Sequence, residues 1–458
     1  MLVLSIEKKR EFRVYLRILA NMIGAVGLVA VLASCSTSPG YDYTVGGTVS
    51  GMVGSGMVLQ NNGGDDLSIS ANGSFSFAAA LTDGTAYAIT VKTQPTNPSQ
   101  TCSVSYGSGT VNGAPVYNVV VSCVTGPTSV TVDPSGHFAY ATNQDGTISA
   151  YTIDQTYGTL TVLGTPVAAG TYPTSVTVDP LKRGFAYAVD TVGGNIYAYT
   201  IETDGTLAAL GTPVAAGAYP ASVTVDPLGR FVYVANMGDN SISAYTIDSI
   251  SGTLNPICGG STGITCPSTG KSPASIITVL IGSSEFAYVA NMSDYTISAY
   301  NIDSISGTLN PICGGSTGIT CPSAGTYPSS VTVDQSGKFV YVANEFSNNI
   351  SVYTIDQTYG TLTAVTIVDA GTSPTSIITV KLPVGEFAYV TNTIDGTVWF
   401  YSINSSDGSL TYLGQVSAGT YPASVTVDPL LRFAYVANMG GGNISVFKIN
   451  SNGTLTSP

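Results

Sequence analysis

Two short segments match the Gly-x-Ser-x-Gly pattern that presents the nucleophilic serine of many hydrolases. They span residues 259–263 and 314–318. A serine of this kind sits on a turn from a strand to a helix and needs a histidine base within hydrogen-bonding reach. Each segment instead lies between two closely spaced cysteines, in a stretch whose pattern predicts strands. The sequence therefore predicts that both matches are coincidental and that no catalytic residue lies there.

The chain has one histidine, His137, and it is a weak candidate for a general base. It follows an Asp-Pro-Ser-Gly turn, and later copies of the pattern place Arg230 and Lys338 at its position, which predicts an exposed turn residue. We expect the aspartates that open these turns to cap them locally rather than to form a ring of carboxylates. With one histidine and no Cys-x₂-Cys pair, neither a metal nor a cofactor is expected. The turn aspartates are Asp133, Asp179, Asp226, Asp334 and Asp428.

Aromatic and amide side chains recur at two further positions of the pattern, and they form the candidate ligand site. Aromatic faces together with amides suit the binding of a carbohydrate or a peptide. In the alternative interpretation, each Tyr-Pro pair packs between repeats and each asparagine caps a turn. The tyrosines, each followed by proline, are Tyr172, Tyr219, Tyr327 and Tyr421. The asparagines, each at the end of a strand-like run, are Asn236, Asn291, Asn344, Asn392 and Asn438.

These residues belong to a sequence repeat that fills the chain from Ser129 onward. One copy begins Ser-Val-Thr-Val-Asp-Pro-Leu-Gly-Arg-Phe-Val-Tyr-Val-Ala-Asn, and its alternation and turn residues predict four short strands. Units of this length with four strands are typical of β-propeller blades, in which the loops carrying the tyrosines and asparagines share one rim. Seven copies predict seven blades, beginning at Ser129, Ser175, Ser222, Ser275, Ser330, Ser376 and Ser424.

One copy contains Tyr-Val-Thr-Asn at residues 389–392, and four others contain Tyr-Val-Ala-Asn. In these residues the region 129–458 resembles the YVTN-repeat, lactonase-like family of seven-bladed propellers. The resemblance implies the propeller fold. The lactonase members of the family open sugar lactones with charged groups around the central cleft. No residues of this chain correspond to those groups one by one, so the resemblance leaves the activity open.

Residues 1–35 are predicted to be a signal segment rather than part of the folded protein. Basic residues from Lys8 to Arg17 precede an apolar run, residues 18–32, that is too short for a membrane span. The sequence Leu-Ala-Ser-Cys ending at Cys35 resembles a bacterial lipobox, which implies cleavage before Cys35 and acylation of its thiol. Acyl chains would anchor the protein to a membrane. Ser36, which is not an aspartate, favours the outer membrane where there are two membranes. The alternative is an ordinary cleaved signal with an incidental cysteine.

The other six cysteines form three local pairs, which we expect to be disulfides in an exported protein. Metal ligation is the alternative, and the lack of further histidines disfavours it. Only 9% of the residues are charged and the formal net charge is −13. Because nucleic-acid phosphates need lysine and arginine, nucleic acid is excluded as a partner. The expected disulfides are Cys102/Cys123, Cys258/Cys266 and Cys313/Cys321.

The unrepeated residues 44–124 predict a small β-sandwich, immunoglobulin-like or transthyretin-like, after a tether at residues 36–43. The propeller follows at residues 125–458, and because its last copy is short, the segment before Ser129 is expected to complete that blade. We predict a monomeric, all-β, lipid-anchored envelope protein whose propeller binds a glycan or a protein as a scaffold. The alternative is a lactonase-like hydrolase of the 6-phosphogluconolactonase type that acts on a sugar lactone.

Overall fold

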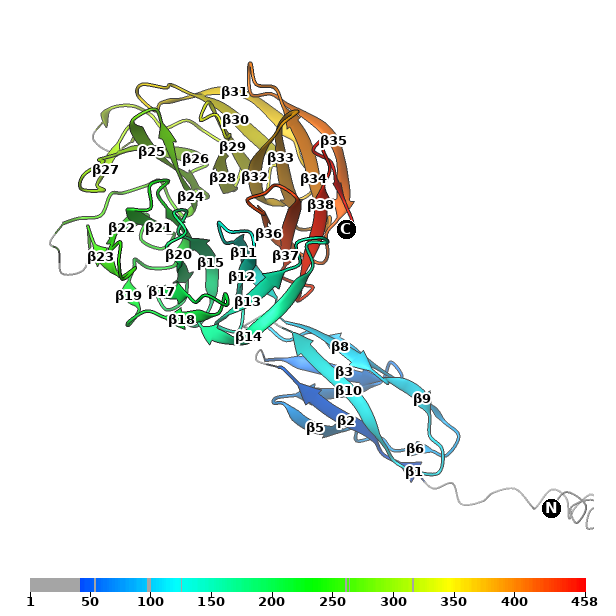
Figure 1. Cartoon of the computed structure of the whole chain (residues 1–458). Coiled ribbons are helices and arrows are strands. Elements are labelled where there is room, and N and C mark those ends of the chain that lie inside the picture. Colours follow the sequence, from blue (N-terminus) through cyan, green and yellow to red (C-terminus); the bar gives the residue numbers. More distant parts are fainter. Residues whose placement is uncertain are drawn as a thin grey trace, which may run out of the picture. The chain divides into compact units, whose positions relative to one another are not determined.

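The part of the chain that the structure, a computed structural model, describes contains 39 strands and no α-helix, so the predicted all-β class is confirmed (Figure 1). Within this part, no helix is long and apolar enough to cross a membrane. The chain divides into two compact units, and the second consists mainly of Ser122–Pro458. The described residues are 42–52, 55–96, 100–124, 126–259, 262, 264–314 and 317–458.

The strands before residue 125 form two four-stranded sheets of order β5-β2-β10-β8 and β4-β3-β7-β9, and a two-stranded sheet of β1 and β6. Burial alternates along β7, where Tyr87 and Ile89 are buried and their neighbours are exposed. Such alternation gives a sheet one apolar face, as the predicted β-sandwich requires. The strands are β1 (Asp42–Tyr43), β2 (Val45–Ser50), β3 (Met57–Asn61), β4 (Asp65–Ile69), β5 (Gly73–Ser76), β6 (Leu81–Thr82), β7 (Ala86–Thr93), β8 (Thr101–Ser105), β9 (Ser108–Thr110) and β10 (Val116–Val124).

Seven further sheets, each built from strands that are consecutive in the sequence, form the seven blades of a propeller. In Figure 1 the first strand of each blade, strand A, lies nearest the centre of the ring, and strands B, C and D follow outward. The A strands are β11 (Pro127–Val132), β15 (Pro173–Val178), β20 (Pro220–Val225), β24 (Pro273–Ile281), β28 (Pro328–Val333), β32 (Pro374–Leu382) and β36 (Pro422–Val427).

The outer three strands of each blade pair in the same order in all seven sheets, and blade 2 carries an extra short strand beside strand C. The B strands are β12 (Phe138–Asn143), β16 (Phe185–Asp190), β21 (Phe231–Asn236), β25 (Ser284–Asn291), β29 (Phe339–Asn344), β33 (Gly385–Asn392) and β37 (Phe433–Asn438). The C strands are β13 (Thr147–Ile153), β17 (Asn195–Ile201), β22 (Ser241–Ile247), β26 (Thr296–Ile302), β30 (Asn349–Ile355), β34 (Thr397–Ile403) and β38 (Asn443–Ile449). The D strands are β14 (Leu160–Ala168), β18 (Leu207–Ala209) with the extra β19 (Val214–Ala215), β23 (Leu254–Pro256), β27 (Leu309–Pro311), β31 (Leu362–Asp369), β35 (Leu410–Ser417) and β39 (Leu455–Thr456).

The repeated tyrosine of strand B links each blade to the next one. The fully buried Tyr233 hydroxyl donates to the backbone oxygen of Gly307, in the C–D turn of the following blade, over 2.9 Å. Gly307 has a left-handed φ of 71°, and the Phe231 ring lies 2.4 Å from where a Cβ would stand, so only glycine fits. The same bond recurs in the pairs Tyr140–Gly205, Tyr187–Gly252, Tyr288–Gly360, Tyr341–Gly408, Tyr389–Gly453 and Tyr435–Gly158.

The ring closes between blade 7 and blade 1 without exchanging a strand. The fourth strand of blade 7 is β39, at the end of the chain, so the prediction that the segment before Ser129 completes this blade is wrong. Closure comes instead from the Tyr435–Gly158 hydrogen bond and from the Val130 amide, which donates to the Ser424 hydroxyl. Strands A, B and C of blade 1 and strand B of blade 7 also share a buried apolar cluster. These contacts join blade 7 to blade 1, although the outermost strand of blade 7, β39, has only two residues.

Candidate functional site

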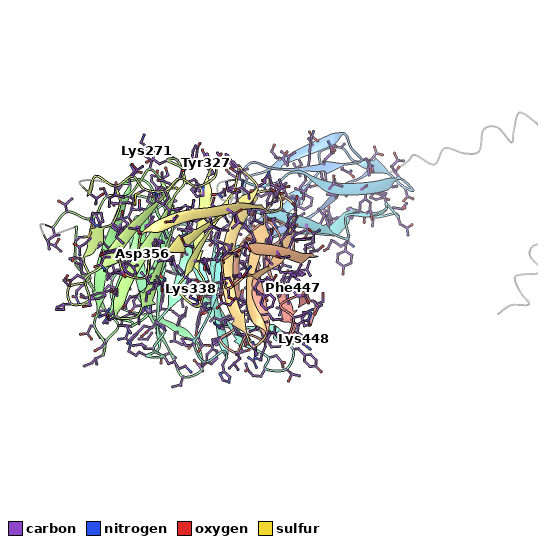
Figure 2. The ribbon with its side chains drawn as sticks, turned by 90° about the horizontal axis from the view of Figure 1, so that it is seen from above. Lys271, Tyr327, Lys338, Asp356, Phe447 and Lys448 are labelled. Atoms are coloured by element: carbon purple, nitrogen blue, oxygen red, sulfur yellow. A yellow bond between two sulfur atoms is a disulfide. The ribbon has the colours of Figure 1, made fainter. Side chains whose placement is uncertain are left out.

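The loops from strand D to the next strand A and from strand B to strand C lie on one rim, which we call the tyrosine rim. Figure 2 shows Tyr327 and Lys271 on this rim and Lys448 toward the opposite one. Tyr219 and Tyr421 are 55% and 51% exposed, and with Tyr327 they have left-handed φ angles of 51°, 52° and 58°. This conformation is unfavourable for a bulky residue, which makes these tyrosines candidates for a functional surface.

Tyr172, the fourth predicted tyrosine, sits in a different environment. Its backbone amide donates to Asp190 Oδ1 over 2.9 Å, and its hydroxyl accepts a long bond from the Gln144 side chain. Asp190 replaces the asparagine of the other repeats, and its second oxygen accepts from the Thr171 amide. Tyr172 is half-buried, so it offers a ligand less of its ring than Tyr219 or Tyr421.

The asparagines predicted to contact a ligand lie in the protein interior. In blade 5, the Asn344 amide group donates to Ser351 Oγ over 2.9 Å, and its Oδ1 accepts from the Gly325 amide of the D–A loop. These bonds tie strand B to strand C and to the loop, which agrees with the turn-capping alternative. The burial contradicts the predicted ligand role, because all five side chains have no exposed surface: Asn236, Asn291, Asn344, Asn392 and Asn438.

Three aromatic side chains from neighbouring loops meet on the tyrosine rim, and we call them the aromatic platform. The rings of Tyr327 and Phe346 are stacked, with centroids 4.0 Å apart and an interplanar angle of 22°. Tyr295 lies 6.0 Å from Tyr327. Phe346 is 61% exposed and Tyr295 is 39% exposed. Tyr295 and Phe346 were not predicted as site residues. Both are aromatic residues in B–C loops that share a rim with the Tyr-Pro loops, a feature that the sequence itself contains.

In every blade, strand B ends in the buried asparagine or in the residue that replaces it. We call the seven residues that directly follow these strand ends the mouth ring. In blade 5, the Glu345 amide donates to the Tyr327 oxygen, one residue before strand A. In blade 6, the Thr393 hydroxyl donates to the oxygen of Pro422, the first residue of the next innermost strand. These bonds place the ring beside the central channel. Its members are Gln144, Thr191, Met237, Met292, Glu345, Thr393 and Met439.

Glu345 is the one ionisable member of the mouth ring, and the sequence analysis did not single it out. It is half-buried, and the Ser373 hydroxyl donates to its Oε1 over 3.2 Å. Burial raises the pKa of the Glu345 carboxyl, and the hydrogen bond from Ser373 opposes that rise. It forms none of the ion pairs found among the described residues. A half-buried carboxyl with a raised pKa on the mouth ring is a candidate general base.

The turn aspartates of the opposite rim and the charged residues paired with them serve the fold. Asp226 is fully buried, and its Oδ1 accepts from the backbone amides of Arg230 and Phe231, so local turn capping is confirmed. The Arg230 guanidinium also pairs with Asp226 and, over 2.5 Å, with Glu285. Burial and then Asp226 raise the pKa of Glu285, whereas Arg230 lowers it. His137 is exposed and lies beside the Ser135 hydroxyl, as predicted for a turn residue.

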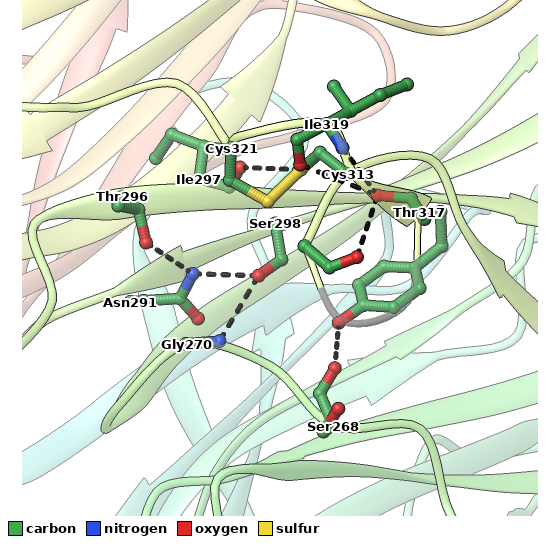
Figure 3. Close-up of a disulfide and its surroundings, with 12 residues drawn as sticks. Ser268, Gly270, Asn291, Thr296, Ile297, Ser298, Cys313, Thr317, Ile319 and Cys321 are labelled. Atoms are coloured by element: carbon green, nitrogen blue, oxygen red, sulfur yellow. Dashed lines mark hydrogen bonds between the residues drawn. A yellow bond between two sulfur atoms is a disulfide. The ribbon is translucent and has the colours of Figure 1, made fainter.

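The three predicted disulfides are confirmed: Cys102–Cys123, Cys258–Cys266 and Cys313–Cys321. Figure 3 shows the Cys313–Cys321 loop, in which the Thr317 hydroxyl donates to the Gly314 oxygen and accepts from the Ile319 amide. This loop and its copy in blade 3 line a cavity of about 450 Å³. The pattern serines Ser261 and Ser316, like Cys35, lie outside the described residues, and within those residues no cluster of His, Cys, Asp or Glu suits a metal.

Seven blades of four strands, with one extra strand in blade 2, define a seven-bladed β-propeller, and Glu345 is the one ionisable residue of its mouth ring. Family comparison identifies the group within this class. The chain belongs to the family described as "Lactonase, 7-bladed beta-propeller", whose model matches residues 113–214, 140–258, 208–312, 261–379 and 366–458. The resemblance seen in the sequence is therefore confirmed. No curated protein matches the chain.

Solved structures agree with this fold. A proposed 6-phosphogluconolactonase from Bacteroides fragilis NCTC 9343 is 18% identical, with a TM-score of 0.56 over 85% of this chain and 98% of that one. The periplasmic gluconolactonase PpgL of Pseudomonas aeruginosa is 18% identical, with a TM-score of 0.54 over 65% and 86%. A protein from Lactobacillus plantarum is 25% identical, with a TM-score of 0.55 over 68% and 90%. The first two likenesses establish the fold alone.

Proposed function

We propose that the protein is a lactonase-like hydrolase that opens a sugar lactone at the tyrosine rim of its propeller. Membership of the lactonase family supports the reaction, and the gluconolactonase among the similar structures supports the substrate class. The observation that carries the proposal is Glu345, the one ionisable side chain of the mouth ring, with a pKa that burial raises.

In this proposal Glu345 is the general base. Its carboxylate takes a proton from water as the water oxygen bonds to the lactone carbonyl carbon, the ring C–O bond then breaks, and the proton passes to the departing oxygen. The product is the open hydroxy acid. The Ser373 hydroxyl orients Oε1 through its hydrogen bond. Because the base acts when deprotonated, turnover rises as pH increases through the raised pKa of Glu345.

The aromatic platform supplies the sugar contact in this arrangement. Phe346 directly follows Glu345 in the chain, and its ring stacks on Tyr327. The apolar C–H face of a sugar ring packs on an aromatic face, while the polar loops leave its hydroxyls in water. In this proposal a lactone bound on the platform extends to the mouth ring, where Glu345 activates water.

The test is hydrolysis of glucono-δ-lactone by the purified protein, corrected for spontaneous opening. We expect Glu345→Gln to lower kcat roughly 10²- to 10⁴-fold with little change in KM, because it removes proton transfer and keeps the shape. Glu202→Gln, in an exposed C–D turn, is the matched control and should leave the rate unchanged. Equal rates for the wild type and Glu345→Gln would reject the assignment of Glu345.

The exposed platform itself favours a second candidate function, the binding of a glycan without turnover. Tyr327 and Phe346 offer stacked, half-exposed faces that a binding module needs, whereas a hydrolase also needs Glu345 to act. The two candidates separate in one experiment. Gluconate or oligosaccharide binding that weakens in Tyr327→Ala and Phe346→Ala, together with turnover at the uncatalysed rate, would favour the binding module.

We also propose that acylated Cys35 anchors this activity in the cell envelope. The proposal rests on the lipobox-like sequence that ends at Cys35 and on the three disulfides, which suit an oxidising compartment. In membrane fractionation, Cys35→Ala should shift the protein from the detergent-dependent fraction to the soluble one. Unchanged membrane association in that variant would contradict the anchor.

A further inference from the structure

A cavity of about 930 Å³ lies on the rim opposite the tyrosine rim, between blades 6, 7 and 1. Its cationic lining residues are Lys381 from strand A of blade 6, and Arg432 and Lys448 from blade 7. The sequence from residue 127 onward has eight lysines and arginines, so three of them meet at this one cavity. No aspartate or glutamate lines it, although the whole chain carries a net charge of −13. The cavity therefore concentrates positive charge on an acidic protein.

Two of the three cations remain available to a ligand. Arg432 is held in place by Asp428 over 2.8 Å and by the Gln155 side chain and backbone oxygen. Lys381 pairs with Glu386 over 3.0 Å but keeps 60% of its side chain exposed. Lys448 is exposed and takes part in none of the ion pairs found among the described residues. Lys448 is thus the cavity cation without an ion-pair partner among the described residues, and Lys381, although paired with Glu386, keeps most of its side chain exposed.

Comparison among the blades shows that these lysines are not part of the repeat. Lys448 pairs with Phe433 in the sheet, and the residue at the corresponding position in the other six blades is threonine, serine or asparagine. Lys381 is the eighth residue of a nine-residue strand A, a position that Leu280 holds in blade 4, the other blade with so long a strand. The repeat therefore requires no cation at either position, although Lys381 pairs with the buried Glu386.

The rest of the lining is mainly aliphatic. It includes Leu382, Val384, Leu430, Leu431 and Ile449, and Val384 and Leu430 are 68% and 61% exposed. Leu431 has a left-handed φ of 57°, a conformation that glycine adopts in the same turn of blades 1, 3 and 5. A branched side chain at this backbone position is unfavourable, and strain of this kind gathers at functional sites. Apolar walls beside two exposed lysine side chains therefore characterise the cavity.

We propose that this cavity binds an amphiphilic organic anion, with a carboxylate or phosphate head between Lys381 and Lys448 and an aliphatic body against the leucines. Charge complementarity selects the head group, and burial of apolar surface on both sides supplies affinity. The site lies on the rim away from Glu345, so it is independent of the proposed hydrolysis. It would bind its ligand whether or not the tyrosine rim turns over a lactone.

Sodium laurate below its micellar concentration is the probe, with dodecanol as the uncharged match, each titrated calorimetrically into the purified full chain. Wild-type protein should bind laurate on the order of tenfold more tightly than dodecanol. The variant Lys381→Leu/Lys448→Thr carries residues that other blades use, and that preference should disappear in it. Because Lys381→Leu also removes the partner of the buried Glu386, its fold is checked by circular dichroism, and Lys448→Thr alone, which keeps that ion pair, should lower the preference as well. Leu430→Ser should weaken both ligands.

The controls lie outside the cavity. Leu228→Ser changes the counterpart of Leu430 in blade 3, and Lys338→Thr removes a cation from an A–B turn that does not line the cavity. Both should bind laurate as the wild type does. A laurate preference that survives in Lys381→Leu/Lys448→Thr, or an equal loss in either control, would overturn the proposal. So would acetate binding as tightly as laurate, because the apolar walls would then play no part.

Discussion

Tyr435 shows how a single hydroxyl group contributes to ring closure. Its side chain is fully buried, and its hydroxyl donates over 3.1 Å to the Gly158 oxygen, which joins blade 7 to blade 1. Tyr435→Phe keeps the ring of the side chain but leaves that buried oxygen without this donor. We expect a loss of about 1–3 kcal/mol in the free energy of unfolding, measured by urea denaturation.

Tyr157→Phe is the matched control, because Tyr157 is 63% exposed in the neighbouring C–D turn. It should change the free energy of unfolding by less than about 0.5 kcal/mol. An equal loss in the two variants would mean that the hydroxyl of Tyr435 contributes nothing specific to closure.

The sequence could identify the strand-B tyrosine as a repeated feature but not as an inter-blade donor. Its acceptor glycine lies 64 to 74 residues further along the chain in six of the seven blades, and for Tyr435 it lies 277 residues back. The asparagines at the ends of the B strands were predicted as ligand contacts for a related reason. An amide suits a ligand and a loop equally well, and only the fold shows that Asn344 is used up by Ser351 and Gly325.

At the scale of elements, the two disulfide loops form a natural matched pair. Cys258–Cys266 and Cys313–Cys321 each join cysteines eight residues apart within identical sequences on adjacent blades. In the chain-entropy description, closing so short a loop stabilises the fold by roughly 2.5 kcal/mol. We expect Cys258→Ala/Cys266→Ala to lower the free energy of unfolding by about this amount.

The same change in the second loop, Cys313→Ala/Cys321→Ala, should cost a similar amount, and both can be read from urea unfolding curves. If neither double variant differs from the wild type, the loops are rigid without their disulfides. A loss confined to one loop would show that the surroundings of the two copies, rather than the loop sequence, set the contribution.

The sequence predicted the repeated strands of the blades, but not the short last strand or the site residues in the B–C loops. Alternation and turn residues predicted four strands for each blade, because those strands repeat seven times with the same spacing. The two-residue strand β39 is too short to carry a periodic signal, so the closure of blade 7 was predicted wrongly. Tyr295, Phe346 and Glu345 lie in B–C loops whose sequences differ between blades, where no period marks them.

At the scale of the whole molecule, buried tyrosine is the most widely distributed titratable group. Twelve tyrosines are fully buried and they occur in all seven blades. Burial raises the pKa of each, to about 12 for Tyr245, Tyr300 and Tyr353 and further for the others. In the unfolded chain the tyrosine pKa is about 10. The folded state therefore retains protons that the unfolded state releases in alkali.

This difference fixes the direction of the pH dependence. The stability that the neutral tyrosines contribute is complete below about pH 10 and declines as pH rises toward their folded pKa values, because deprotonation then favours the unfolded chain. Each tyrosine costs roughly 1.4 kcal/mol per pH unit in that range. Twelve together would exceed a typical total stability of about 5–15 kcal/mol within roughly one unit.

We therefore expect abrupt, cooperative unfolding about one pH unit above 10, followed by circular dichroism and by tyrosinate absorbance on the same sample. The large rise in absorbance should coincide with the loss of strand signal, because the buried hydroxyls ionise only when the blades separate. Gradual ionisation with an intact strand signal up to pH 12 would show that water reaches these hydroxyls in the folded ring. The blades would then be held together by their apolar clusters rather than by the tyrosine bonds.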